Sequence, residues 1–450
     1  MPGNRNNRIE VYVISFFKGE MYMKAKKYAL SMIAVYMAYL THGIQALIFS
    51  QNQVNFALQW GFDMSDPQSE AYKLGVAAVS TAIAWTGFGK FCSVWIGGEI
   101  SDRVGRKKLM IGGAILYVIC FLTMLFTRNA TLAAFAGFLA GVATSGFWDA
   151  SGYPAVQEAY PAAPGAALIG IKFFVSLSGM IYPLLAVRNA AAGNWKLNIY
   201  IPLAMSFVVL ALATAAPYVY DDEKKAAKNS KDGSGDAIAA EIQAAKDRML
   251  VQPNVFTKFL AYFYAFLCMA IMYGAQQYTK AFGLAYSGLT EVQAAGMTTI
   301  YTLGSLCAVI FWAFMMAKLK WNPLKVILVD SVMTVAALAV VLLIHNVTIV
   351  YIAILCIGFF SAGGALQTGL GVVQMFNPGP KGRNTGIYYT FMGAASYLIP
   401  VVASRLTVIS GAGAAVYTLM GLMLILAILA TLSTLYLIAQ HKKVFGESPL

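Results

Sequence analysis

The chain has 450 residues, of which 59% are hydrophobic and 11% are charged, and its formal net charge is +13. Soluble domains carry about 25% charged residues, so this composition excludes a water-soluble globule. Apolar stretches of about 20 residues recur along the chain and predict an all-α membrane protein, since helices of this length cross the hydrocarbon core.

The first segment, 1–27, is expected to be a tail outside the membrane. Within it, Lys18-Gly19-Glu20 resembles a bacterial ribosome-binding site if the codons are AAA-GGA-GAA, and Met23 follows at a suitable distance. Residues 1–22 are therefore either a mis-annotated leader or a short disordered tail. Different codons at these three positions would remove the first alternative.

Twelve membrane spans are expected after the tail, six on each side of a polar stretch. They are 28–49, 74–96, 109–127, 131–154, 166–187 and 197–219, then 256–279, 292–316, 325–344, 348–374, 386–404 and 414–438. The polar stretch, 221–254, is interrupted by Gly and Ser and reads as a linker. It separates two six-helix halves, 28–220 and 255–440, and 441–450 forms a second tail.

The positions of the basic residues predict the orientation. The tails and even-numbered connections hold 24 of the 32 Lys and Arg residues, and the opposite connections hold 6. The positive-inside rule therefore places both termini in the cytoplasm. Anionic lipid headgroups explain the net charge, so no nucleic-acid partner is expected.

Several kinds of site are not expected. The five cysteines lie in spans without a CxxC pair and the three histidines are scattered, so neither a disulfide framework nor a metal is indicated. The sequence GxxxxGK[ST] is absent, which argues against ATP-driven transport. No nucleophile and base recur at a workable spacing, so neither an enzyme nor a cofactor is expected.

A short internal repeat supports the division into halves. VQEAYPAAPG (156–165) and VQMFNPGPKG (373–382) share Val, Gln, Pro and Gly at an offset of 217 residues. The matches fall at the ends of spans four and ten, where a duplicated six-helix unit predicts them. Repeated halves are typical of alternating-access transporters, which bind substrate between the halves.

The connection after span two has the sequence GGEISDRVGRKK (97–108). Gly98 is expected to permit close helix approach, Asp102 to cap or accept charge at the next helix, and Gly105 to allow a tight turn. The basic residues are expected to hold this face at the cytosol; they are Arg103, Arg106, Lys107 and Lys108.

The pattern G-x-x-x-D-R-x-G-R-K resembles the signature loop of the major facilitator superfamily (MFS). It is matched at Gly98, Asp102, Arg103, Gly105, Arg106 and Lys107. The resemblance implies a twelve-helix MFS fold with two pseudo-symmetric halves. It also implies that the loop and an acidic residue after span four, here Glu158, hold the outward-open state. The corresponding loop at 317–325 lacks Asp and the glycines, so this gate is expected to be asymmetric.

A finer resemblance concerns the YdiM/YdiN-like branch of bacterial inner-membrane permeases. It rests on the Lys172 stretch and on YMAYLTHGIQALIFSQN (36–52), DASGYPAVQEAYP (149–161) and GFFSAGGALQTGLGVV (358–373). The resemblance implies the bacterial inner membrane. Through an association with shikimate or quinate metabolism, it also suggests a small hydroxylated carboxylate as substrate.

Three charged residues are expected inside the first half. Lys172 in AALIGIKFFVSLSGM (166–180) and Lys90 each lie about 10 Å from the cytoplasmic boundary, and Asp149 about 13 Å. A charge near the bilayer centre costs about 2.5–3.5 kcal/mol, so each needs a partner or a wet cavity. Either Asp149 forms a salt bridge with one lysine, or a lysine stays free to bind an anion; Lys90 also has the alternative of snorkelling.

Other polar residues complete the candidate site. His42 is either a proton carrier or a buried histidine bonded to a carbonyl, and Asp149 is the alternative proton carrier. In the second half, neutral groups are candidates for hydrogen bonds to substrate hydroxyls; they are Gln276, Gln277, Gln367 and Tyr389. Asp330 is expected to meet Lys325 or the headgroups.

These features predict a monomeric secondary transporter that moves a small carboxylate, shikimate- or quinate-like, by proton symport. The first alternative is proton-coupled efflux of a drug or metabolite. Drug antiporters of this superfamily carry G-x-x-x-G-P-x-x-G-G in span five, of which only Gly179 and Pro183 are present. The second alternative is a solute sensor that does not transport, but no signalling domain is visible.

Overall fold

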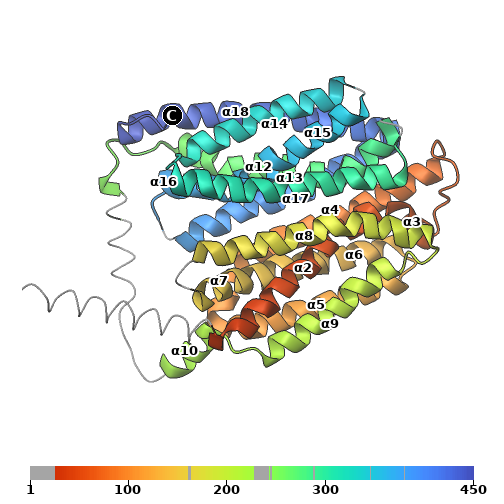
Figure 1. Ribbon diagram of the computed structural model, residues 1–450, viewed down its shortest axis with the longest axis horizontal. Coiled ribbons are helices and arrows are strands. Elements are labelled where there is room, and N and C mark those ends of the chain that lie inside the picture. The colour runs from red at the N-terminus through yellow and green to blue at the C-terminus, as the bar shows by residue number, and fades with distance from the viewer. Residues whose placement is uncertain are drawn as a thin grey trace, which may run out of the picture.

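The structure is a computed structural model that describes residues 26–160, 164–227, 243, 246–286, 289–344, 346–379 and 381–449. Within these residues the secondary structure is helical, without strands. The two alternatives for residues 1–22 fall outside the described part of the chain. Figure 1 shows the long helices side by side in one bundle.

The first half contains the six expected spans and two short additional helices. Its elements are α2 (Ala29–Gln51), α3 (Gln53–Gln59), α4 (Glu70–Val104), α5 (Arg106–Phe126), α6 (Ala130–Gly141), η1 (Val142–Asp149), α7 (Ala150–Ala159), α8 (Pro164–Ala191), α9 (Leu197–Ala215) and α10 (Val219–Ala227). Because α10 continues to Ala227, the first residues of the predicted linker are helical.

The second half contains the other six spans. Its elements are α12 (Val255–Tyr286), α13 (Glu291–Lys318), α14 (Pro323–Leu343), α15 (Val347–Ile357), η2 (Gly358–Gly363), α16 (Ala365–Phe376), α17 (Lys381–Ser410) and α18 (Ala412–Phe445). Asparagine begins three spans of the protein, because its side chain accepts a hydrogen bond from a free N–H of the first turn; these caps are Asn129, Asn322 and Asn346.

A π-helical turn interrupts spans four and ten. The turn η1 separates α6 from α7, and η2 separates α15 from α16. η2 begins 216 residues after η1, within one residue of the offset of the sequence repeat. Single π-helical turns are rare in helices and are frequent at functional sites. The two halves thus share this irregular element as well as their helix order.

Eleven helices or helix series among the described residues are long and apolar enough to cross a membrane. The expected span 74–96 lies in α4, which is not one of the eleven. Lys90 and many Gly, Ser and Thr residues lower the mean hydropathy of α4. It packs along α6 and α17 inside the bundle, so it is the twelfth helix of the fold.

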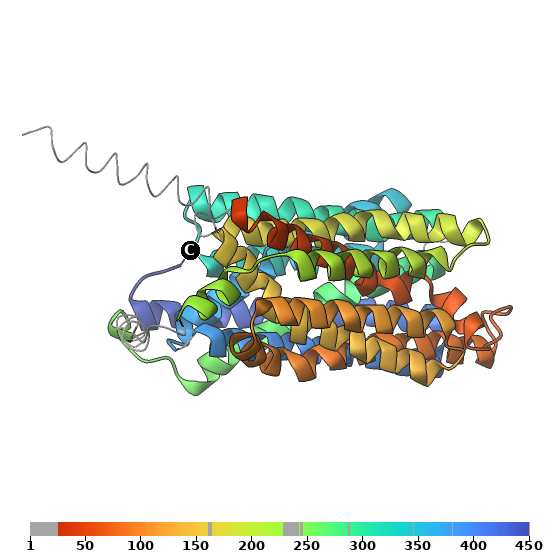
Figure 2. The same ribbon diagram turned by 90° about the horizontal axis from the view of Figure 1, so that it is seen from below.

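The described parts of the chain begin and finish at the same end of the bundle. Figures 1 and 2 show the start of α2, the helix α10 and the end of α18 together there, and the connection between α3 and α4 at the opposite end. We call these the terminal end and the far end. The halves meet where α4 packs on α17 and where α8 packs on α13.

Hydrogen bonds between the halves gather toward the far end. Thr81 Oγ1 lies 3.1 Å from Ser404 Oγ, and Thr299 donates to the carbonyl of Met180 at 2.8 Å. Lys280, which forms an ion pair with Glu291 at 2.9 Å within the second half, donates to the carbonyl of Gln51 at 3.1 Å. The remaining links between the halves are Gln51–Thr298, Gln277–Ala46, Thr302–Gly179 and Ser404–Ala77. The far end is therefore closed in this structure.

Candidate functional site

The three charged residues of the first half approach the second half. The ammonium group of Lys90 lies 5.9 Å from the ring centroid of Tyr273 on α12. Lys172 lies within electrostatic range of Cys268, also on α12, and Asp149 lies within electrostatic range of Tyr389 on α17. The side chains of this group keep partial solvent exposure; they are Lys90, Asp149, Lys172 and Tyr389. This group, together with Tyr39 and Ser145, is the candidate site.

Asp149 finds its hydrogen-bond partners within the first half. Tyr39 donates to Oδ1 at 2.8 Å, and Ser145 donates to Oδ2 at 2.9 Å. Among the described residues, neither Lys90 nor Lys172 approaches this carboxylate within 4.0 Å, so the salt bridge of the first alternative is not formed. Lys90 interacts with Asp149 only over a longer distance.

Lys172 differs from Lys90 and Asp149, which contact Tyr273 and Tyr39 respectively. Its Nζ makes no hydrogen bond or ion pair with a described residue. Cys268 is 4% exposed, so its proximity places Lys172 beside the buried face of α12. A cation in a span needs water or an anion around it.

His42 belongs to a buried polar cluster inside the first half. Its Nδ1 lies 3.0 Å from the hydroxyl of Tyr117, which lies 2.7 Å from Thr144 Oγ1 in η1. The Tyr117 hydroxyl also donates to Gln45 Oε1 at 3.4 Å. The ring of Tyr117 stacks on Trp148 with centroids 4.2 Å apart. His42 is thus a buried histidine whose polar neighbours are the hydroxyl groups of Tyr117 and Thr144 and the side-chain amide of Gln45.

The candidates in the second half do not form one group. Gln277 is buried and donates to the carbonyl of Ala46 at 2.7 Å, which makes it part of the far-end closure. Gln276 is partly exposed on the same helix. Gln367 lies in α16, but its side chain is outside the described residues. Among these candidates, Tyr389 is the one that lies within electrostatic range of Asp149, without a hydrogen bond to it.

The signature loop is organised around Arg106. Only 7% of Arg106 is exposed, and its Nη1 donates to Asp102 Oδ1 at 2.7 Å and to Ser101 Oγ at 2.6 Å. Its Nη2 lies 3.2 Å from Glu158 Oε1, so the acidic residue after span four reaches the loop. The guanidinium also lies 4.3 Å from the ring centroid of Tyr220.

Helix α10 completes this loop. Asp221 Oδ2 accepts a hydrogen bond from the backbone N–H of Lys107 at 3.0 Å, so it caps the first turn of α5. Gly105 has φ +104°, and a Cβ there would lie 2.1 Å from Asp221 Oδ1, so this turn requires glycine. Lys224 donates to the carbonyls of Asp102 and Arg103 at 3.1 and 2.6 Å. The sequence assigned most of α10 to the linker. Of the two roles expected for Asp102, the cap belongs to Asp221, whereas Asp102 accepts charge from Arg106 as expected.

The close helix approach occurs at Gly97, so the role expected for Gly98 is wrong. A Cβ on Gly97 would lie 2.3 Å from the carbonyl oxygen of Gly146, whereas a Cβ on Gly98 would meet nothing within 4 Å. Arg103 is also peripheral, because it is exposed and pairs with Glu99 one turn away. The sequence could not distinguish these two adjacent glycines, because the side of α4 on which each one lies is seen only in the structure.

These two glycines provide a matched pair of substitutions. Gly97→Ala is expected to destabilise the protein by about 1–3 kcal/mol, because backbone atoms of η1 cannot move aside cheaply. Gly98→Ala is expected to be neutral or to stabilise by about 0.5–1 kcal/mol, as for other helix-interior glycines. Thermal unfolding of both purified variants in detergent measures the difference; an equal loss would contradict this packing.

Comparisons with known proteins agree with this architecture. The model of the Major Facilitator Superfamily matches residues 28–374. The chain is 29% identical to the inner membrane transport protein YdiM of Escherichia coli (strain K12), over 83% of this chain and 86% of that protein. It is 26% identical to the inner membrane transport protein YdiN of the same strain, over 84% of each.

A solved structure shows the same fold. The crystal structure of a D-xylose-proton symporter superposes with a TM-score of 0.66 at 14% identity, covering 91% of this chain and 97% of that one. The relatives YdiM and YdiN are named as transport proteins, which agrees with the prediction of a transporter and not an enzyme. The chain is a multi-pass membrane protein of the transporter class, and it belongs to the Major Facilitator Superfamily.

Proposed function

We propose that the chain is a monomeric proton symporter that moves a small organic carboxylate, shikimate- or quinate-like, across the bacterial inner membrane by alternating access. The observation that carries this proposal is the ammonium group of Lys172, which has no ion-pair partner among the described residues and lies near Cys268 of the second half. An anionic substrate held between the halves would supply its missing partner.

The balance of charge in the candidate site supports an anionic substrate. Lys90 and Lys172 contribute two positive charges, and Asp149 contributes one carboxylate that already accepts two hydrogen bonds. The neighbouring groups of the second half, Tyr273 and Tyr389, are neutral. Such a site suits a solute with one carboxylate and several hydroxyl groups.

The closed far end supports alternating access. With the termini in the cytoplasm, as the basic residues indicate, the far end faces outward and this conformation is inward-facing. Arg106 and Glu158 are paired in it, inside the first half, so this pair by itself does not hold the outward-open state that the resemblance implied. We therefore propose that the opposite conformation separates the far-end hydrogen bonds and closes the terminal end over the substrate.

Proton coupling is assigned to Asp149 or His42. Asp149 lies within electrostatic range of Lys90 and Tyr389, so loss of its charge would change the electrostatic potential at both residues. His42 shares the same region through its electrostatic interaction with Lys90. Either group can pass from a charged to a neutral form while the substrate anion is bound.

The test is uptake by purified protein in proteoliposomes with an imposed pH gradient. Radiolabelled shikimate and quinate are compared with neutral sugars, nucleosides and cationic drugs. Concentrative uptake of the acids, abolished when a protonophore collapses the gradient, is the expected result. Movement of sugars or cationic drugs in place of acids would overturn the substrate class, and outward drug movement would favour the efflux alternative.

Cross-linking the far end is expected to stop transport. Because Thr81 Oγ1 and Ser404 Oγ lie 3.1 Å apart, the pair Thr81→Cys and Ser404→Cys should form a disulfide under oxidising conditions. The exposed Cys92 and Cys307 are first replaced by serine. Oxidation should remove uptake and dithiothreitol should restore it, while Thr81→Cys alone stays active. Full uptake by the cross-linked pair would contradict alternating access.

A further inference from the structure

A second acidic side chain lies in the spans, apart from the candidate site. Asp330 on α14 is 1% exposed, and both of its carboxyl oxygens lack a hydrogen-bond partner among the described residues. The expected partner Lys325 instead lies 4.5 Å from the ring centroid of Trp321, so the sequence expectation for Asp330 is wrong. The indole N–H of Trp312 is the nearest donor to this carboxyl, although the two groups do not meet the geometry of a full hydrogen bond.

An ionised carboxylate cannot remain in such surroundings without compensation. Moving an unpaired charge out of water costs far more than a protein can recover from packing, and buried acids therefore bind a proton or a cation. The nearby hydroxyl groups do not satisfy it. Ser331 donates to Leu328, Thr334 to the backbone of Asp330, and Ser361 to Ile357.

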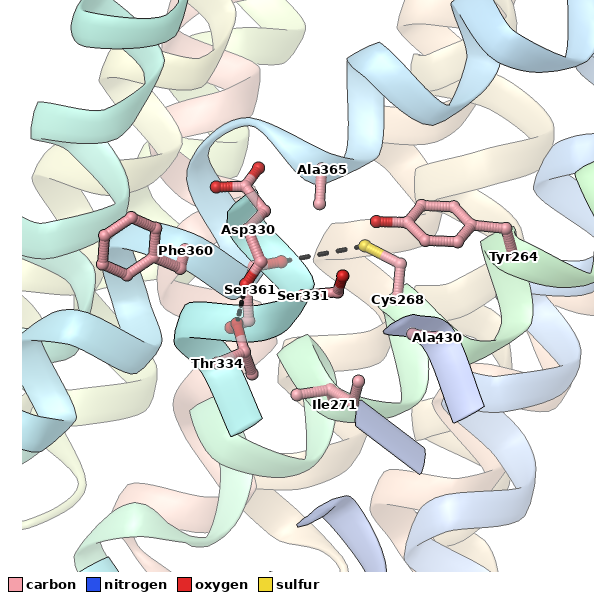
Figure 3. Close-up of a pocket in the computed structure, with 10 residues that line it drawn as sticks. All are labelled: Tyr264, Cys268, Ile271, Asp330, Ser331, Thr334, Phe360, Ser361, Ala365 and Ala430. Atoms are coloured by element: carbon pink, nitrogen blue, oxygen red, sulfur yellow. Dashed lines mark hydrogen bonds between the residues drawn. The ribbon is translucent and has the colours of Figure 1, made fainter. Parts of the chain in front are cut away.

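The surroundings of the carboxyl restrict what it can bind (Figure 3). The cavity beside it offers about 10 Å³, close to the space for one water molecule, so it excludes an organic solute. Tyr264 and Cys268 on α12 are the titratable groups besides Asp330 in the lining. The other lining residues come from α12, α14, η2, α16 and α18 and are not titratable; they are Ile271, Ser331, Thr334, Phe360, Ser361, Ala365 and Ala430.

We propose that Asp330 is a proton-binding site of the second half, occupied by a proton in the conformation described here. A single carboxyl group with already committed hydroxyls suits a proton better than a metal cation, which needs several oxygen ligands. The role of this proton in transport rests on the proposed symport, whereas its binding does not.

The position of Asp330 links the proton to the irregular segment of span ten. A Cβ on Gly364, directly after η2, would lie 2.8 Å from Asp330 Oδ2 and 2.2 Å from Cδ1 of Trp312. The backbone thus packs directly against the carboxyl. Release of the proton would leave a charge that this contact does not accommodate, so η2 and Gly364 would have to move and admit water.

Infrared difference spectroscopy of the purified protein tests this assignment. Exchange from H₂O to D₂O shifts the carbonyl band of a protonated carboxyl group, and ionised carboxylates give no such band. We expect the shifted band in the wild type and its partial loss in Asp330→Asn, which keeps the shape of a protonated acid. Ser331→Ala changes a neighbouring lining residue and should keep the whole band.

The outcomes separate this inference from the proposed function. An unchanged band in folded Asp330→Asn would show that Asp330 is ionised and would overturn the proposal. A sodium site would also overturn the proposal. In that case NaCl would raise the melting temperature of the wild type relative to choline chloride, and it would not raise that of Asp330→Asn. If the band is partly lost in Asp330→Asn but the wild type takes up no acid, the proposed symport is refuted and the proton site at Asp330 still holds.

Discussion

Lys172→Gln is expected to reduce acid uptake into proteoliposomes by roughly 30-fold or more. Truncating one member of a buried charge pair costs at least about 2 kcal/mol, and each 1.4 kcal/mol is a factor of ten. Glutamine keeps most of the length and polarity of lysine, so the loss would report the charge. The measurement is the concentration dependence of initial uptake rates under a fixed pH gradient.

Two further variants serve as controls for this result. Lys172→Arg retains the charge and should recover a large part of the uptake. Lys90→Gln should have a smaller effect, because Lys90 already interacts with Tyr273 and Asp149. A Lys172→Gln variant that transports normally would show that Lys172 does not bind the substrate, and equal losses at both positions would show that Lys172 has no special role beside Lys90.

Arg106→Ala is expected to destabilise the first half by about 3 kcal/mol. The substitution removes a nearly buried guanidinium that holds Asp102, Ser101 and Glu158, and it leaves Glu158 without its partner. Arg103→Ala is the matched control, because Arg103 forms an exposed pair with Glu99. Exposed pairs contribute about 0–1 kcal/mol, so this variant should unfold like the wild type.

Thermal unfolding in detergent, followed by intrinsic fluorescence, measures both variants. Arg106→Lys should lie between them, because an ammonium group cannot reproduce the forked geometry of the guanidinium. If Arg103→Ala destabilises the protein as strongly as Arg106→Ala, Arg106 is not the residue whose contacts stabilise the signature loop.

Local patterns in the sequence were sufficient for much of the fold. Hydropathy located the twelve spans, since the membrane imposes helices of a fixed minimum length. α4 shows the limit of that rule. Lys90 lowers its mean hydropathy below that of the other spans, although α4 packs against both α6 and α17 inside the bundle. The π-helical turns were not predicted, since they depend on packing and not on a periodic pattern.

The candidate site was predicted only in part. Charge inside an apolar span identified Lys172, Lys90 and Asp149, because burial of charge is costly wherever it occurs. Their partners were not predictable, since the Tyr39–Asp149 contact joins residues 110 positions apart. Asp221 was missed for the same reason, as it caps a helix 114 residues away in sequence.

The most direct test of the central claim compares a carboxylic acid with its own amide. Uptake, or competition for uptake, is measured for a transported acid and for the matching neutral carboxamide, in the wild type and in Lys172→Gln. The account predicts that the wild type prefers the acid strongly and that Lys172→Gln loses this preference. Equal preference for the acid in both proteins would contradict an anion site at Lys172.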